Sequence, residues 1–248
     1  MGIFNRSSLK GFFQKGRVPT EEHFSNLIDS SINKIDDGFT KSIENGLKLS
    51  PLGDSKKLIS FYDDIKNKNS LWDISLNPNE TAKGLSISEE KGGSRLFLQR
   101  GGNVGIGTLA PKHQLDVYGS VGMSNRIGTF QAQSEIAADS EWHIIINDLT
   151  GCHAFEIVAK VAGIKKRGKY AIAHAIAVSA FDSRSNTIRV TQSHYGMFWH
   201  RLRFRWRHAE GGKYRLEMST SDHYGTDLEN KVVQIKYHIT SLWDDKLG

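Results

Sequence analysis

Four arginines alternate with apolar residues near the C-terminal end, and of all the side chains they most suggest chemistry. They are Arg201, Arg203, Arg205 and Arg207. Alternate residues of a β-strand point to the same face, so successive arginines would lie about 7 Å apart. The residues between them, Leu202, Phe204 and Trp206, would pack in a core from the other face, and Phe198 and His200 continue the same alternation. Like charges in a row repel and need partners.

Three interpretations of this arginine row remain open. It is a ligand site for acidic sugars or phosphate, an interface whose neighbour supplies carboxylates, or a solvated strand face balanced by ions. Two loops offer a second candidate site, because they combine aromatic, small and hydrogen-bonding residues. Tyr195 lies in the first loop, and His223 and Tyr224 lie in the second. Such loops suit sugar recognition, and their alternative is an ordinary hairpin turn.

Catalytic and metal-binding motifs are missing from the sequence. There is one cysteine, Cys152, and the 10 histidines form no H-E-x-x-H pattern. No G-x-S-x-G elbow occurs, and no motif places a carboxylate pair for sugar cleavage. Gly105 to Ala110 matches G-x-G-x-x-A, but the residues that follow alternate like a strand instead of opening a helix. We therefore expect no cofactor, no metal and no enzyme.

Residues 129–248 contain both candidate sites and must form the domain that positions them. Seven segments alternate between apolar and other residues, which is typical of an antiparallel β-sandwich. They span 142–148, 155–161, 170–178, 186–194, 198–206, 214–218 and 233–239. The segment at 170–178 has an unbroken set of alanines on one face, which lets a second sheet or a sister subunit approach closely.

Residues 41–128 carry short apolar pairs separated by glycine or polar turns. Val104 with Ile106, and Leu115 with Val117, are two such pairs. Strands this short cannot bury a core alone, and a single chain would expose their edges. We expect three intertwined chains with a shared axial core, and the alternative is an ordinary open sheet.

The sequence of residues 1–40 indicates two helices. The first is short and spans 7–15, and the second begins after the N-cap Thr20 and ends at Asp36-Asp37-Gly38. The second helix carries one apolar stripe. The stripe consists of Phe24, Leu27, Ile28, Ile32 and Ile35. It either packs within its own domain or docks and trimerises at one end of a fibre.

Residues 101–122, GGNVGIGTLAPKHQLDVYGSVG, resemble a segment of trimeric tail fibres of phages and contractile injection systems. Residues 12–39 are similar to the N-terminal part of fibre proteins encoded beside such systems. Leu109-Ala110 departs from the usual small polar residues, but the turn proline is kept at Pro111. The resemblance implies a homotrimeric tail-fibre or tail-pin protein. Its N-terminus would bind a baseplate or other particle protein, and its head would bind a surface glycan or receptor.

Composition agrees with such a protein. The 248 residues carry a net charge of +6, which permits anionic partners without requiring nucleic acid. No signal peptide or membrane span is evident, so we expect synthesis in the cytoplasm followed by assembly into a particle or extracellular structure. The expected fold is mainly β, with short N-terminal helices, an intertwined trimeric β shaft and a C-terminal antiparallel β-sandwich head. Alternative functions are a lectin-like module acting alone and a polysaccharide-acting enzyme.

Overall fold

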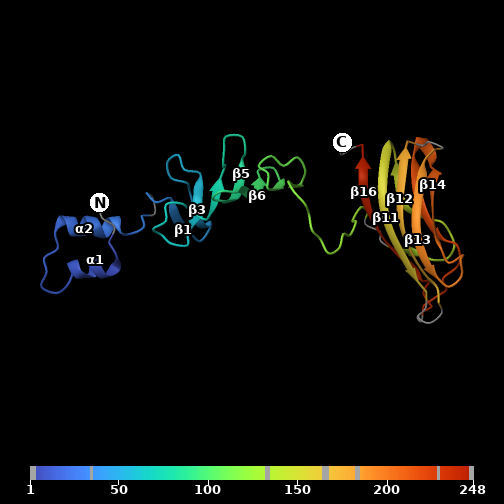
Figure 1. Ribbon diagram of the computed structural model, residues 1–248, viewed down its shortest axis with the longest axis horizontal. Helices are drawn as coiled ribbons and strands as arrows, with labels where there is room; N and C mark the ends of the chain where they lie inside the picture. The colour runs from blue at the N-terminus through green and yellow to red at the C-terminus, as the bar shows by residue number, and fades with distance from the viewer. Residues whose placement is uncertain are drawn as a thin grey trace. The chain divides into compact units, whose positions relative to one another are not determined.

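The computed structural model describes residues 4–33, 36–131, 135–163, 168–181, 185–227 and 230–245. The chain is mainly β and divides into two compact units, one ending at Gly122 and the other beginning at Met123. Figure 1 shows the helices and strands of the first unit in blue to green, and the long strands of the second in yellow to red.

Two short helices open the first unit, α1 (Arg6–Phe12) and α2 (Glu21–Asp29). Thr20 caps α2 as predicted, and its hydroxyl accepts from the backbone N–H of His23. The helix ends at Asp29, earlier than the sequence predicts. The hydroxyls of Ser30 and Ser31 donate to carbonyls four residues back, and serines that bond in this way weaken a helix. The first helix is also shorter than predicted.

The apolar stripe of α2 stays largely uncovered. Phe24, Leu27, Ile28 and Ile32 are exposed, and Ile35 lies outside the described residues. Contact between the helices comes from aromatic rings instead. Phe12 stacks on His23 at 4.3 Å between ring centroids, and Phe13 meets Phe24 edge to face at 5.4 Å.

The strands of the first unit form a hairpin and a six-stranded sheet. The hairpin pairs β1 (Phe39–Ser42) with β2 (Gly46–Leu49). The sheet has the order β3-β4-β5-β6-β7-β8 and is antiparallel except for the parallel β7–β8 pair. Its strands are β3 (Lys57–Phe61), β4 (Trp72–Leu76), β5 (Gly84–Glu89), β6 (Gly93–Gln99), β7 (Val104–Ile106) and β8 (Leu115–Val117).

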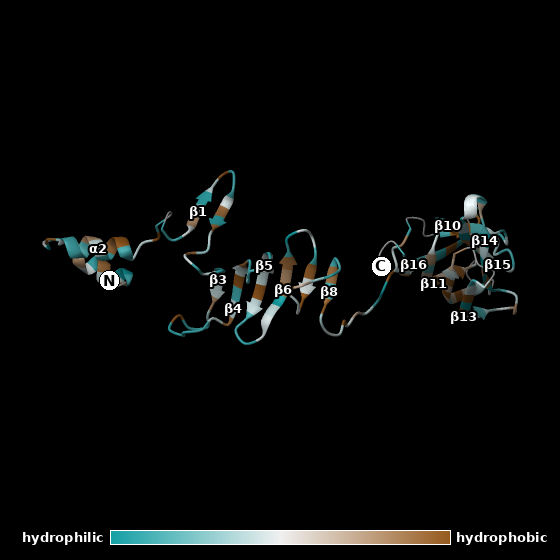
Figure 2. Ribbon diagram, turned by 90° about the horizontal axis from the view of Figure 1, so that it is seen from above, coloured by the Kyte–Doolittle hydropathy of each residue, from teal (hydrophilic) through white to brown (hydrophobic). Residues whose placement is uncertain are grey.

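One face of this sheet is aliphatic, and we call it the aliphatic face. The strand register aligns its side chains in two rows. Figure 2 shows brown, hydrophobic segments along strands of this sheet. The first row is Ile59, Ile74, Ile87, Leu96, Ile106 and Val117. The second row is Leu76, Leu85, Leu98, Val104 and Leu115. None of these eleven side chains is buried.

The opposite face of the sheet is polar and better covered. Asp73, Ser75, Ser86 and Phe97 are buried there. Asp73 accepts hydrogen bonds from Ser60 at 2.6 Å and Ser70 at 2.7 Å, and it pairs with Lys57 at 2.8 Å. Burial alone would raise the pKa of Asp73, but the hydrogen bonds from Lys57, Ser60 and Ser70 outweigh it and lower this pKa. The chain therefore satisfies its polar face and leaves its aliphatic face half-exposed.

The second unit contains two antiparallel sheets. The larger has the order β13-β12-β11-β16-β9, and the smaller has the order β10-β15-β14. The larger consists of β9 (Glu135–Ala137), β11 (Cys152–Ala162), β12 (Tyr170–Ala180), β13 (Thr187–Tyr195) and β16 (Gln234–Asp244). The smaller consists of β10 (His143–Leu149), β14 (Leu202–His208) and β15 (Tyr214–Thr220).

Both sheets contribute side chains to one hydrophobic core. The alanines of β12 face this core, as the close packing predicted for them requires, and larger core residues come from β11 and β16. Phe155, Ile157, Tyr237 and Ile239 are among these residues, and Leu202, Leu216 and Met218 come from the smaller sheet. Small residues on β12 let a second layer approach closely without voids.

The prediction for residues 198–206 was wrong at its start, because β14 begins only at Leu202. Before it the chain turns, with Gly196 at φ +101° and the His200 N–H donating to the Met197 carbonyl. A positive φ of this kind favours glycine and breaks the strand. Phe198, which the alternating pattern placed within the strand, is exposed at this turn.

Candidate functional site

The arginine row does share one face of β14, apart from its first member. Arg203, Arg205 and Arg207 alternate with Leu202, Phe204 and Trp206, which belong to the core or pack against it. Arg201 precedes the strand and is exposed. One strand therefore places three of the four arginines on the same face, as predicted.

The charge of Arg205 is balanced within the chain. Glu217 lies opposite Arg205 in the register of β14 and β15, and its side chain is only 3% exposed. Its carboxylate accepts from Arg205 Nε at 2.7 Å and from Arg215 Nε at 2.7 Å. The guanidinium of Arg205 also stacks 4.0 Å from the ring centre of Trp142. Here the chain itself supplies the carboxylate that one interpretation assigned to a neighbouring protein.

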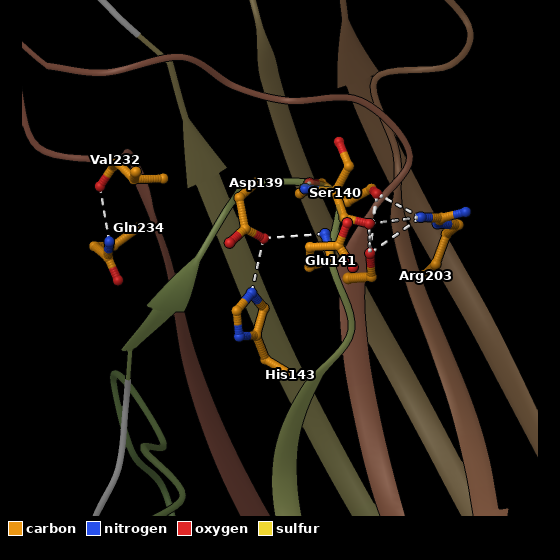
Figure 3. Close-up of polar contacts among 9 residues, drawn as sticks. Asp139, Ser140, Glu141, His143, Arg203, Val232 and Gln234 are labelled. Atoms are coloured by element: carbon orange, nitrogen blue, oxygen red, sulfur yellow. Dashed lines mark hydrogen bonds and ion pairs between the residues drawn. The ribbon is translucent and has the colours of Figure 1, made fainter.

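Arg203 fastens the loop before β10 to the smaller sheet (Figure 3). Its Nη2 donates to the Thr220 carbonyl at 2.8 Å, the Ser219 hydroxyl at 3.1 Å and the Ser140 carbonyl at 3.3 Å. Figure 3 also shows Asp139 next along this loop, bonded to His143 at 2.7 Å and to the Glu141 N–H at 3.0 Å. Burial alone would raise the pKa of Asp139. The hydrogen bonds from His143 and the Glu141 N–H outweigh this effect, so the pKa of Asp139 is below its ordinary value.

The two loops with candidate sugar-binding residues come together at one end of the second unit. Lys169 Nζ donates to Asp222 Oδ2 at 2.7 Å and to the His223 carbonyl at 2.9 Å. Asp222 Oδ2 also lies 3.5 Å from Nε2 of the buried His200, whose Nδ1 accepts from the Met197 N–H at 3.1 Å. The hydrogen bond from Lys169 lowers the pKa of Asp222 despite some burial. These bonds anchor the turn at 195–200 to the loop at 221–224.

The anchored turn presents apolar side chains outward. Tyr195, Met197, Phe198 and Trp199 are exposed, and the rings of Phe198 and Trp199 meet at 4.7 Å. We call residues 195–199 the aromatic turn. Exposed aromatic groups in a fixed turn offer binding surface at a low entropic cost.

Tyr224 does not lie on this surface, although the sequence placed it there. It is 2% exposed and belongs to the core, and its hydroxyl meets no hydrogen-bond partner among the described residues. Burial, and to a lesser degree the charge of Asp222, raises its pKa to about 12. His223 is exposed, and its Nδ1 accepts from the Gly225 N–H. Tyr195 and His223 therefore remain surface groups at this end, while the arginine row belongs to the other sheet.

Sequence reasoning did not connect Lys169, His200 and Asp222, whose contacts hold the two loops together. They lie in three separate loops, and no local spacing connects them. The candidate attachment residues form a different set, in the first unit. Val104 and Val117 are half-buried, whereas Ile106 and Leu115 are exposed.

Within the described ranges, no three His, Cys, Asp or Glu side chains are placed to hold a metal ion. No described helix is long and apolar enough to cross a membrane. Comparison with protein-family models finds no match, and no curated protein is significantly similar to the chain.

Proposed function

We propose that this protein is a structural and receptor-binding fibre subunit of a phage-tail-like contractile particle. It works as a homotrimer in which residues 41–128 form the shaft and the second unit is a β-sandwich head. The N-terminal helices attach the fibre to the particle, and the head contacts a surface glycan or receptor.

The aliphatic face carries this proposal. Two rows of aliphatic side chains cross the sheet, and none of them is buried in the single chain. Monomeric soluble proteins rarely expose large contiguous apolar patches, so a face with two aliphatic rows across six strands marks an interaction site. Copies of the same chain are the occupant that fits, because each brings an identical face. The resemblance of residues 101–122 to trimeric fibres supports three copies in particular.

Two further observations support the parts assigned to each end. The exposed stripe of α2 provides an apolar surface for a particle protein, consistent with an attachment role. The aromatic turn provides the kind of surface that stacks on sugar rings.

Light scattering after size exclusion tests the oligomeric state. We expect a mass of about three times 27.8 kDa for the full chain. Ile106→Asp places a charge on the aliphatic face, where the side chain is 42% exposed in one chain, and should yield a folded monomer. Val178→Asp is the matched control, because Val178 is 45% exposed but lies on the larger sheet of the second unit. It should remain a trimer.

A wild-type monomer at micromolar concentration would rule out the fibre and favour a lectin-like module acting alone. A trimer that survives Ile106→Asp unchanged would show that the aliphatic face is not the contact between copies.

A further inference from the structure

A groove on the outer face of the larger sheet has the chemistry of a ligand site. Two neighbouring cavities of about 750 Å³ and 380 Å³ both include Lys160 of β11 in their lining. The smaller is also lined by Tyr170, Ile172, Ser193 and Tyr195, and the larger by Lys236 and Glu135. We call this surface the lysine groove. It meets the aromatic turn at Tyr195.

Two lysines face each other across the strands of this groove. Lys160 of β11 is paired in register with Lys236 of β16. Side chains at directly opposed positions are close neighbours, and like charges there destabilise a sheet. Glu135 lies 3.3 Å from Lys236 Nζ, but Lys160 has no acidic partner among the described residues. This differs from Arg205, whose charge Glu217 balances, and it leaves Lys160 available to an anion.

The aromatic part of the groove lies beside the charged part. Tyr170 and Tyr195 are opposed in register, and their rings meet edge to face at 6.2 Å. Tyr195 is 67% exposed, so a ring face is free to contact a ligand. Gly168, at φ +71°, lies against the Tyr195 ring, and a Cβ there would be in ordinary van der Waals contact with it at 3.5 Å.

We propose that the lysine groove binds a carboxylate-bearing saccharide. Lys160 and Lys236 meet the carboxylate as point charges, and the tyrosines stack on the apolar faces of the sugar rings. The Ser193 hydroxyl donates or accepts hydrogen bonds with sugar hydroxyls, and the Glu135 carboxylate accepts them. The inference rests on the proposed receptor-binding role and names its ligand class and site.

Calorimetric titration of the full chain with short oligosaccharides tests this site. Tetragalacturonate should bind, and uncharged maltotetraose of the same length should bind at least about tenfold more weakly. Lys160→Gln should weaken tetragalacturonate binding about fivefold, as expected for one partly exposed charge pair. Tyr195→Ala should weaken it about tenfold through lost stacking. Arg189→Gln removes a charge from the same face outside both cavities, and it should change the affinity less than about twofold.

Several results would overturn the proposal. They are no binding of tetragalacturonate, equal binding of maltotetraose, a loss in Arg189→Gln as large as in Lys160→Gln, or equally tight binding of inorganic phosphate or of a thymidine tetranucleotide. A change of mass in Lys160→Gln would instead identify the face as a contact between copies and would also overturn it. Because the groove lies within one chain, a monomer that still binds tetragalacturonate would contradict the fibre while leaving the groove intact.

Discussion

Replacement of Tyr224 by Phe distinguishes a core tyrosine from a ligand-binding one. The side chain is 2% exposed, and its hydroxyl has no partner in the described parts of the chain. Burying a hydroxyl without a hydrogen bond costs about 1–3 kcal/mol. Tyr224→Phe removes this cost but leaves a small void, so the free energy of unfolding at pH 8 should stay equal or rise by up to about 1 kcal/mol.

The same substitution has a predictable effect at alkaline pH. In the unfolded chain a tyrosine loses its proton near pH 10, whereas Tyr224 in the folded protein keeps it until about pH 12. The unfolded state is therefore favoured as pH rises above 10, and the contribution present below that pH is lost by about pH 12. At pH 11 the loss amounts to about 1.4 kcal/mol in the wild type, and Tyr224→Phe should avoid it.

Denaturant unfolding of both proteins at pH 8 and pH 11 measures this difference, with exposed Tyr195→Phe as the control. The change between the two pH values should be about 1.4 kcal/mol smaller in Tyr224→Phe than in the wild type or the control. If Tyr224→Phe lost about 2 kcal/mol already at pH 8, its hydroxyl would have to make a stabilising bond, and the reasoning would fail.

Two further predictions concern backbone and charge. Gly105→Ala should destabilise the first unit by about 3 kcal/mol in calorimetry, because its Cβ would stand 2.3 Å from the Thr108 carbonyl oxygen, whereas Gly122→Ala meets open space and should be nearly neutral. Equal melting of the two glycine variants would contradict this. Arg203→Ala should cost about 1–2 kcal/mol of unfolding free energy, because three acceptors lose their donor, whereas exposed Arg207→Ala should stay within about 0.5 kcal/mol. Similar costs for the two arginines would show that the bonds drawn in Figure 3 contribute little.

The sequence determined the elements whose signals are local. The alternating segments around Phe155, Ile172 and Leu216 became strands, and Thr20 capped its helix, because side-chain period and capping depend on residues close in the chain. The sequence also led to the wrong start for the strand at Leu202. There a turn that depends on Gly196 and on contacts of His200 overrides the alternating pattern.

Tertiary structure decided which charges are balanced and which are not. Alternation shows only which residues share a face, so the sequence alone does not show which arginines of the row have partners or whether Lys160 has one. Pairing of β14 with β15 brings Glu217 to Arg205, whereas pairing of β11 with β16 sets Lys160 against Lys236. These partners are distant in the chain, and only strand register brings them together. The same register aligns eleven aliphatic residues on the aliphatic face, an arrangement that isolated apolar pairs indicate only in part.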